Sequence, residues 1–325
     1  MVLFEQRALL ILFNAIQSVG RRDVYFLPTN VCPIIPAAFL KAKVKFELVD
    51  IDPETLCIDE KIVMELLSRA SENTSGLLYV RTYGVEGSAD GFFERVRKLR
   101  PQTFIIDDKC LCRPDFRSEA SLGSDLTLFS TGYSKFADIG GGGIGFLNRD
   151  PGAYRRVQLP FRPEHHESLL EEMNDAIKKD RKFLPNDSDW LGDSAFEGDF
   201  AKYRAQVEKA SLIAREHKDE LNAIYSRNLP AHIQMKSEFQ NWRFNILVPD
   251  KQRLLENIFA SGLFASSHYA PLSKVFSSGT DATAREIHGR TVNLFNDFRF
   301  DKDRALAACK IVRDHLESRD KHAGT

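Results

Sequence analysis

Apolar and polar positions follow two different periods along the chain, and together they predict strands that alternate with helices. Short apolar runs predict strands at 24–27, 44–49, 76–80, 104–106, 126–129 and 144–147. Apolar residues at helical spacing predict helices at 8–19, 34–42, 59–70 and 92–99. This order is typical of an α/β protein with a mostly parallel central sheet that helices cover on both faces.

The pattern weakens at residues 151–194, and no element is predicted there. We interpret the adjacent His165 and His166 as an exposed loop pair rather than as metal ligands, because irregular surface loops are commonly polar. A long charged helix is predicted at 197–227, followed by strands at 244–248 and 292–295 and helices at 254–262 and 305–316. We therefore expect a large domain over residues 1–220 and a small α+β domain over residues 221–325.

The clearest candidate chemistry lies in DLTLFSTGYSKFADIGGGGIGF, at residues 125–146. Lys135 follows a predicted strand and a loop of hydroxyl and glycine residues, and four glycines at 140–143 come after it. A lysine amine that burial and neighbouring charge keep unprotonated can form a Schiff base with a carbonyl compound. The hydroxyl and N–H groups of the loop can hold a phosphate. A surface lysine before a glycine-rich turn is the ordinary alternative.

Two carboxylates, Asp107 and Asp108, end the strand predicted at 104–106. Ligands of parallel sheets bind outside the carboxyl ends of the strands, so we expect this pair to lie near the loop that carries Lys135. Successive side chains of a strand point to opposite faces, so only one of the two carboxylates can readily face the lysine.

Charge and composition exclude several classes of function. The net charge of −1 argues against a general binder of nucleic acid or of anionic membranes. No apolar run approaches the ~20 residues of a membrane span, and no signal-peptide core is present, so we expect a cytoplasmic protein. The five cysteines are scattered, which suits reduced thiols, and they lack the spacing of a metal site.

Several short motifs occur in a fixed order along the chain. They are DVYFLP at 23–28, VDIDP at 49–53, YG at 83–84, IDD at 106–108, SLG at 121–123, FSTGYSK at 129–135 and HYAPL at 268–272. In this order they resemble the DegT/DnrJ/EryC1 family of pyridoxal-phosphate-dependent enzymes, which are mostly sugar aminotransferases of fold type I. The ordered series is more specific than any one of its motifs.

The resemblance implies a role for each matched residue. Lys135 is similar to the lysine that binds pyridoxal phosphate covalently, and Ser130 to a phosphate ligand. Asp108 is similar to the partner of the pyridine nitrogen, which a carboxylate keeps protonated so that the ring can accept electrons. Where the family has Ser-Gly-Thr before its first helix, this chain has Glu5, Gln6 and Arg7.

Two further positions follow from the same alignment. We expect Gln6 and Arg7 near the cofactor phosphate, because a guanidinium can make two charge-assisted hydrogen bonds. An ordinary surface arginine is the alternative. Cys32 falls where the family carries the aromatic residue that stacks on the cofactor ring.

The resemblance therefore implies a pyridoxal-phosphate-dependent aminotransferase. It would transfer an amino group, from glutamate, to a keto-sugar that is linked to a nucleotide, and it would act as a homodimer with neither a nucleic-acid nor a membrane partner. The altered residues leave three alternatives open: a pyridoxal-phosphate enzyme with another reaction or a non-sugar substrate, a non-catalytic relative that serves as a binding or regulatory protein, and an unrelated α/β protein.

Overall fold

The computed structural model describes residues 1–18, 24–70, 75–117, 123–149, 154–192, 198–277 and 279–323. Some positions used above lie outside the described residues. They are the end of the first predicted helix at 19, Asp23, residues 121–122, residues 151–153 and 193–194, and the predicted start of the long helix at 197. Among the described helices, none combines the length and the apolar character that crossing a membrane requires.

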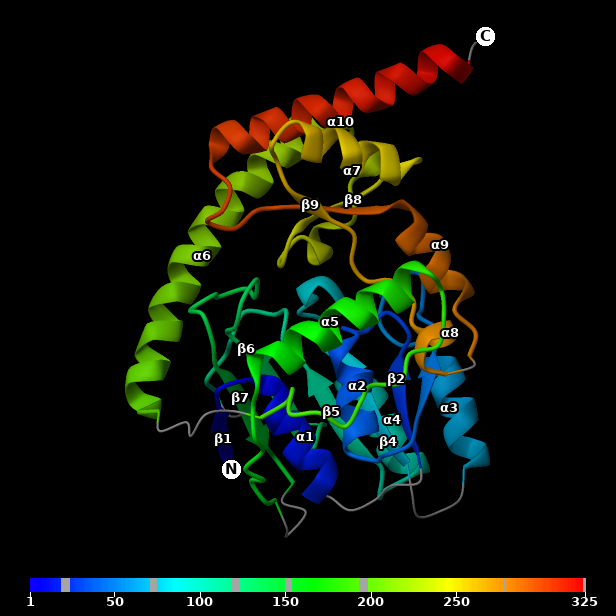
Figure 1. Cartoon of the computed structure of the whole chain (residues 1–325), viewed down its shortest axis with the longest axis vertical. Helices are drawn as coiled ribbons and strands as arrows, with labels where there is room; N and C mark the ends of the chain where they lie inside the picture. Colours follow the sequence, from blue (N-terminus) through cyan, green and yellow to red (C-terminus); the bar gives the residue numbers. More distant parts are fainter. Residues whose placement is uncertain are drawn as a thin grey trace.

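A seven-stranded sheet forms the larger part of the described structure, in the order β1-β7-β6-β5-β4-β2-β3 (Figure 1). Its strands are β1 (Val2–Glu5), β2 (Val24–Pro28), β3 (Phe46–Val49), β4 (Ser75–Val80), β5 (Phe104–Asp108), β6 (Leu126–Ser130) and β7 (Gly143–Leu147). Strands β2 to β6 pair in parallel, and β7 is antiparallel to both β1 and β6. The predicted mostly parallel sheet is thus confirmed, whereas the four-residue β1 was not predicted.

Helices cover both faces of this sheet and make separate cores with it. The helices are α1 (Ala8–Ser18), α2 (Ile34–Lys41), α3 (Glu60–Arg69) and α4 (Asp90–Leu99). Phe104 and Ile106 of β5 pack in the core that contains α1 and α2, whereas Ile105 packs in the core that contains α3 and α4. This alternation determines which face each residue at the end of β5 occupies.

The segment in which no element was predicted contains a helix, α5 (Pro163–Lys178). Its proline stands in the first turn, where no backbone N–H is needed. Leu169, Met173 and Ala176 are buried at helical spacing and join the core of α1 and α2. Charged neighbours obscured this period in the sequence. The interpretation of His165 and His166 as loop residues was wrong, since both lie in this helix, which crosses in front of α2 in Figure 1.

A long helix, α6 (Phe200–Asn228), leads from the large sheet to a second, antiparallel sheet (Figure 1). The second sheet has the order β8-β10-β9. The α-helices and strands that follow α6 are β8 (Phe244–Leu247), α7 (Lys251–Ala260), β9 (Ala265–Ser266), α8 (Ser273–Phe276), α9 (Ala282–Arg290), β10 (Thr291–Leu294) and α10 (Lys302–Ala323). The expected domain boundary at residue 220 falls within α6 and stays a prediction.

One buried carboxylate joins the large sheet to α9. Asp50, directly after β3, accepts hydrogen bonds from the N–H groups of Thr283 (2.9 Å) and Ala284 (3.0 Å) in the first turn of α9. It also accepts one from the N–H of Ile51 at 2.9 Å. Asp281, the residue that precedes α9, makes no capping hydrogen bond with its side chain. Asp50 therefore caps a helix that lies more than 200 residues further along the chain.

We expect Asp50→Ala to lower the free energy of unfolding by about 2 kcal/mol, because it removes a cap and leaves buried N–H groups unpaired. Urea denaturation followed by circular dichroism measures this loss. Glu47→Ala, at an exposed position of β3, is the matched control and should change stability by less than about 0.5 kcal/mol. Equal effects of the two substitutions would contradict the assigned role of Asp50.

Candidate active site

A cavity of about 220 Å³ lies at the carboxyl ends of β4, β5 and β6, beside α1 and α2. Five of the residues singled out from the sequence line it: Arg7, Cys32, Asp108, Ser130 and Lys135. Gln6 does not, and its carbonyl instead accepts a hydrogen bond from the N–H of Gly142 at 2.7 Å. The fold thus brings together residues from four separate parts of the sequence.

Asp108 points into this cavity. It lies on the same face of β5 as Ile106 and is only 3% exposed. Its Oδ1 accepts a hydrogen bond from the N–H of Cys110 at 2.9 Å, and no described residue forms an ion pair with it. Burial raises the pKa of Asp108, although the hydrogen bonds from Cys110 and the charge of Lys135 oppose that rise. The cavity therefore presents a carboxylate that would be stabilised by a cationic partner.

Asp107 points to the other face and is already paired. Its Oδ1 accepts from Nε of Arg81 at 2.7 Å, and its Oδ2 accepts from Nη2 at 2.9 Å. Both side chains are almost fully buried. This two-pronged geometry uses both oxygens of Asp107, so of the two carboxylates it is Asp108 that faces Lys135.

Lys135 is half-buried in the loop between β6 and β7. Its amine lines the cavity and has no hydrogen-bond or ion-pair partner among the described residues. Ser130, at the end of β6, lies on the same face of its strand as Leu128, and both line the cavity. The lysine, the serine and the free carboxylate of Asp108 therefore share one enclosed space.

The start of α1 lines the same cavity and could offer backbone donors to a ligand. Ala8 and Leu9 line it, and N–H groups in the first turn of a helix have no acceptor within that helix. A Cβ at Gly143 would lie 2.1 Å from the nitrogen of Ala8, so only glycine at this position lets α1 approach β7 so closely. These donors, together with Ser130 and Gly132, make a suitable place for an anion.

The residues present fit pyridoxal phosphate. Its phosphate suits the donors at Ser130, Gly132 and the start of α1. Its protonated ring nitrogen suits the unpaired carboxylate of Asp108, and its aldehyde suits the unpaired amine of Lys135. The observation behind this fit is that a buried carboxylate and an amine, neither with an ionic partner among the described residues, line one cavity.

Arg7 and Cys32, two predicted cofactor contacts, both line the cavity. Arg7 lines the cavity, but its Nη2 donates to the carbonyls of Leu191 (3.4 Å) and Gly192, and its guanidinium lies 4.6 Å from the ring centre of Phe161. Its contact with the phosphate stays a prediction. Burial raises the pKa of the Cys32 thiol, so this cavity-lining side chain is neutral. Its contact with the cofactor ring also stays a prediction.

An outer chamber of about 740 Å³ adjoins the first cavity and shares Cys32, Ile34, His166 and Tyr269 with it. Its further lining includes Leu170, Met173 and Ile177 of α5. His166 is a site residue that sequence reasoning missed. The helical spacing of the leucines and Met173 after it is the signal that would have placed it on an inward-facing helix.

Two neutral imidazoles line these spaces: His166 lines both, and His268 lines the outer chamber. Burial and the nearby charge of Arg7 lower the pKa of His166. Burial, with the charges of Arg243 and Lys135, lowers the pKa of His268 to about 4. Both rings are therefore uncharged near neutral pH and can act as hydrogen-bond donors or acceptors toward a ligand.

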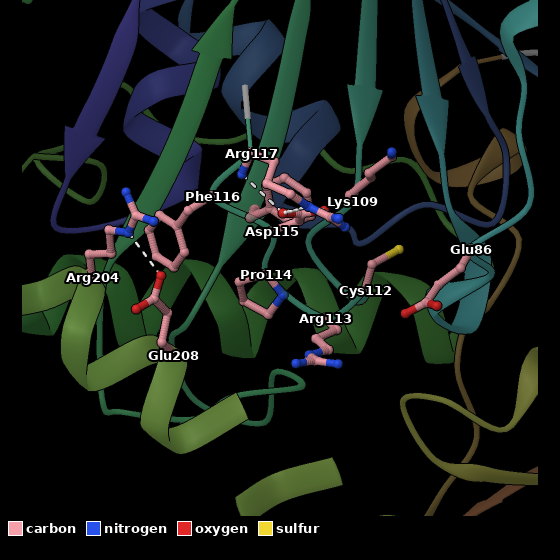
Figure 2. A pocket seen from close by; sticks show the side chains of 11 residues that line it. Glu86, Lys109, Cys112, Arg113, Pro114, Asp115, Phe116, Arg117, Arg204 and Glu208 are labelled. Atoms are coloured by element: carbon pink, nitrogen blue, oxygen red, sulfur yellow. Dashed lines mark hydrogen bonds and ion pairs between the residues drawn. The ribbon is translucent and has the colours of Figure 1, made fainter. Parts of the chain in front are cut away.

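A second cavity, of about 610 Å³, is lined by residues that follow β5 and by Arg204 and Glu208 of α6 (Figure 2). Lys109 and Cys112 line it, whereas Asp108 and Cys110 line the first cavity. Much of its charge is neutralised internally: Arg117 pairs with Asp115 at 2.8 Å, and Arg204 pairs with Glu208 at 2.8 Å (Figure 2). None of the candidate cofactor-binding residues predicted from the sequence lines this second cavity. Within the described residues, no cluster of side chains suits a metal ion.

Comparison with known proteins gives matches among solved structures. No family model and no curated protein matches the sequence. DesI in the presence of its TDP-sugar product has a TM-score of 0.71 and 16% identity, covering 98% of this chain and 83% of that chain. The aminotransferase PseC from Helicobacter pylori, involved in pseudoaminic acid biosynthesis, has a TM-score of 0.69 and 14% identity, covering 98% and 87%.

A DegT DnrJ EryC1 StrS aminotransferase from Brucella abortus has a TM-score of 0.67 and 14% identity, covering 97% of this chain and 85% of that chain. The chain has the fold of these aminotransferases. The fold that the sequence resemblance implied is thereby confirmed over almost the whole chain.

Replacing each of the two neighbouring aspartates by asparagine should affect the stability of the protein differently. Asp107→Asn should lower the free energy of unfolding by about 3 kcal/mol, because it leaves the buried Arg81 without its anion. Asp108→Asn should not destabilise the cofactor-free protein, since it removes a buried carboxylate that forms no ion pair with the described residues. Urea denaturation of both variants at pH 7 makes the comparison.

The raised pKa of Asp108 determines in which direction the stability of the folded protein changes with pH. The folded protein holds this proton more tightly than the unfolded chain, so stability falls as the pH rises above the ordinary carboxyl pKa of about 4. Asp108→Asn should remove that part of the fall. A larger loss of stability in Asp108→Asn than in Asp107→Asn would show that the two faces of β5 are assigned wrongly.

Proposed function

We propose that this protein is a pyridoxal-phosphate-dependent aminotransferase that acts on a keto-sugar. One observation carries the proposal: the amine of Lys135 and the carboxylate of Asp108 line one cavity and have no ionic partners among the described residues. The likeness to solved aminotransferases supports it, since that fold can place such a pair at the carboxyl ends of parallel strands.

The cofactor would be held at both ends. Ser130, Gly132 and the first turn of α1 would bind its phosphate, and the helix dipole would add to this attraction. Asp108 would bind the ring nitrogen and hold its proton in a site where burial strengthens the attraction between opposite charges. When bound, pyridoxal phosphate supplies the electron sink that makes a carbon–hydrogen bond beside the substrate nitrogen acidic.

Lys135 would have two tasks. Its amine would bind the cofactor aldehyde in the resting protein. Once a substrate amine displaces it, Lys135 would take a proton from one substrate carbon and return it to another position, as a general base and then a general acid. The neutral rings of His166, which lines both spaces, and of His268, which lines the outer chamber, would orient the substrate without adding charge.

The size and lining of the outer chamber would determine which substrates can enter. DesI was solved with a TDP-sugar product, which favours a nucleotide-linked keto-sugar for this chain. Glutamate is the amino donor that the sequence resemblance implies. The apolar wall of Leu170, Met173 and Ile177 favours a second candidate, a keto substrate whose body is apolar rather than a sugar. Transfer of the amino group from glutamate to a panel containing both substrate types would distinguish the two.

We expect the wild-type protein to bind pyridoxal phosphate with a visible absorbance band that Lys135→Ala lacks, because that substitution removes the amine that binds the aldehyde. Borohydride reduction followed by peptide mapping should locate the cofactor on Lys135. Lys209→Ala, which changes an exposed lysine of α6, is the matched control and should keep the band. A reduced adduct on any other lysine would contradict the assignment.

The donor reaction tests the reaction class separately. Glutamate added to the cofactor-loaded protein should bleach the visible band and release an equivalent amount of 2-oxoglutarate, because the amino group moves to the cofactor. A protein that binds the cofactor on Lys135 but releases no keto acid from glutamate or other amino acids would be a pyridoxal-phosphate protein with another function.

The same proposal includes a cytoplasmic homodimer. The described cysteines are all free thiols, which supports a reducing compartment. Leu212 and Ile213 on α6 are 56% and 58% exposed, and the aromatic rings of Tyr133 and Phe298 are exposed beside Arg299. Neighbouring exposed apolar side chains of this kind are typical of protein interfaces.

We expect light scattering to give twice the chain mass of 36.9 kDa. Ile213→Glu should shift this mass toward that of the single chain, because it buries a charge in the proposed interface. Leu306→Glu, at another exposed apolar position on α10, is the control and should leave the mass unchanged. A wild-type mass of one chain at micromolar concentration would rule the dimer out.

A further inference from the structure

Ser134, the residue before Lys135, is held at each of its polar atoms. Its N–H donates to Oδ2 of Asp138 at 2.8 Å, and its Oγ accepts from Nη2 of Arg243 at 2.9 Å. Its carbonyl accepts from Nε1 of Trp242 at 2.6 Å. Its φ of 61° lies in the left-handed region, which is unfavourable for a residue with a side chain. Such a conformation persists where the surroundings fix it, and here three hydrogen bonds do so.

Two of these hydrogen bonds come from the second sheet. Trp242 and Arg243 directly precede β8, and they lie more than 100 residues from Ser134 in sequence. The Arg243 guanidinium is 2% exposed, pairs with Asp297 just after β10, and lies 3.7 Å from the ring centre of Phe295. Its position is therefore fixed by the core of the second sheet rather than by the loop it contacts.

The interactions close into a ring. Arg243 pairs with Asp297, and Asp297 accepts from Nη1 of Arg299 at 3.0 Å. Nη2 of Arg299 then binds Oδ2 of Asp138 at 2.9 Å, and the same oxygen accepts the N–H of Ser134. Every member restrains its two neighbours, so the loop cannot shift relative to the second sheet without breaking a charged hydrogen bond.

We infer that Trp242 and Arg243 are positioning residues for Lys135 and act through Ser134. Neither lines the inner cavity with Lys135, so a contact with the cofactor does not account for their arrangement. The amine of Lys135 extends from a backbone whose direction is set one residue earlier, at Ser134. This inference rests on the proposed function, in which the position of that amine determines the rate.

Two conservative substitutions test it, and each removes one hydrogen bond to Ser134. Ser134→Ala deletes the acceptor of Arg243, and Trp242→Phe deletes the indole donor but keeps an aromatic ring. Tyr225→Phe is the matched control, since it deletes a hydroxyl that donates to the carbonyl of Phe295 at 2.7 Å in the core of the second sheet. The single variants and the double variant are compared as full chains, after their melting temperatures confirm that they fold.

In the cofactor-loaded protein, the double variant should lose about 100-fold in kcat with an unchanged KM for glutamate, because displacing the amine impairs proton transfer and not substrate binding. The pH titration of the visible absorbance band should shift in the same variants. The control should keep both the wild-type kcat and the wild-type titration.

Two measurements do not depend on the cofactor. The first is the rate of hydrogen exchange in peptides spanning residues 131–140. The second is the rate at which acetic anhydride labels Lys135 relative to other lysines. Each rate should rise about tenfold in the double variant and not in the control. Wild-type exchange and labelling in the double variant would overturn the inference. A wild-type chain that binds no pyridoxal phosphate would overturn the proposed function instead, and exchange and labelling would still decide whether Ser134 is held in this way.

Discussion

The site depends on a carboxylate that is buried without an ion pair to any described residue. Asp108 is withdrawn from water at the end of a central strand, and the described residues compensate it only with hydrogen bonds from Cys110 and the nearby amine of Lys135. Burial of an anion in this way is unfavourable, so the arrangement becomes favourable when a cationic group occupies the cavity. The same cost explains why the adjacent Asp107 is matched so closely by Arg81, because two uncompensated carboxylates at one strand end would repel each other.

The parts of the site come from separate layers of the fold. The parallel sheet contributes Asp108 and Ser130, the first turn of α1 contributes backbone donors, and α5 forms the wall of the outer chamber. Of the described residues after α6, Tyr269, between β9 and α8, lines the inner cavity. Trp242 and Arg243, directly before β8, do not line it, yet they hold the loop of Lys135. The loop is thus fixed from outside the cavity, and its inner face stays free for a ligand.

The likeness to known aminotransferases is a likeness of fold at 14–16% identity. Fold alone does not determine function, so the proposed reaction depends on the side chains in the cavity. The cavity combines the lysine Lys135, the carboxylate Asp108 and the start of α1 with Cys32 and Arg7, which stand where the family has other residues. The apolar wall supplied by α5 is a further local feature, and it is the part of the site that bears most directly on which substrate enters.

Much of the fold and site followed from local sequence. The strands β2 to β7 and the first four helices were predictable, because side-chain period depends on residues close together in the chain. The same local reasoning selected Lys135, Asp108 and Ser130 as candidates, since each stands at the end of a strand or in the loop that follows.

Other features depended on contacts between distant segments. The sequence did not reveal β1, whose four residues are defined by pairing with β7, or α5, whose buried face is interrupted by charged residues. It also did not show that Arg7 donates to carbonyls 184 and 185 residues away, or that Ser134 is held from positions more than 100 residues further on. Local sequence determined which elements form and which residues are chemically capable; tertiary packing decided which of them meet, because hydrogen bonds and ion pairs between distant residues exist only once the layers have assembled.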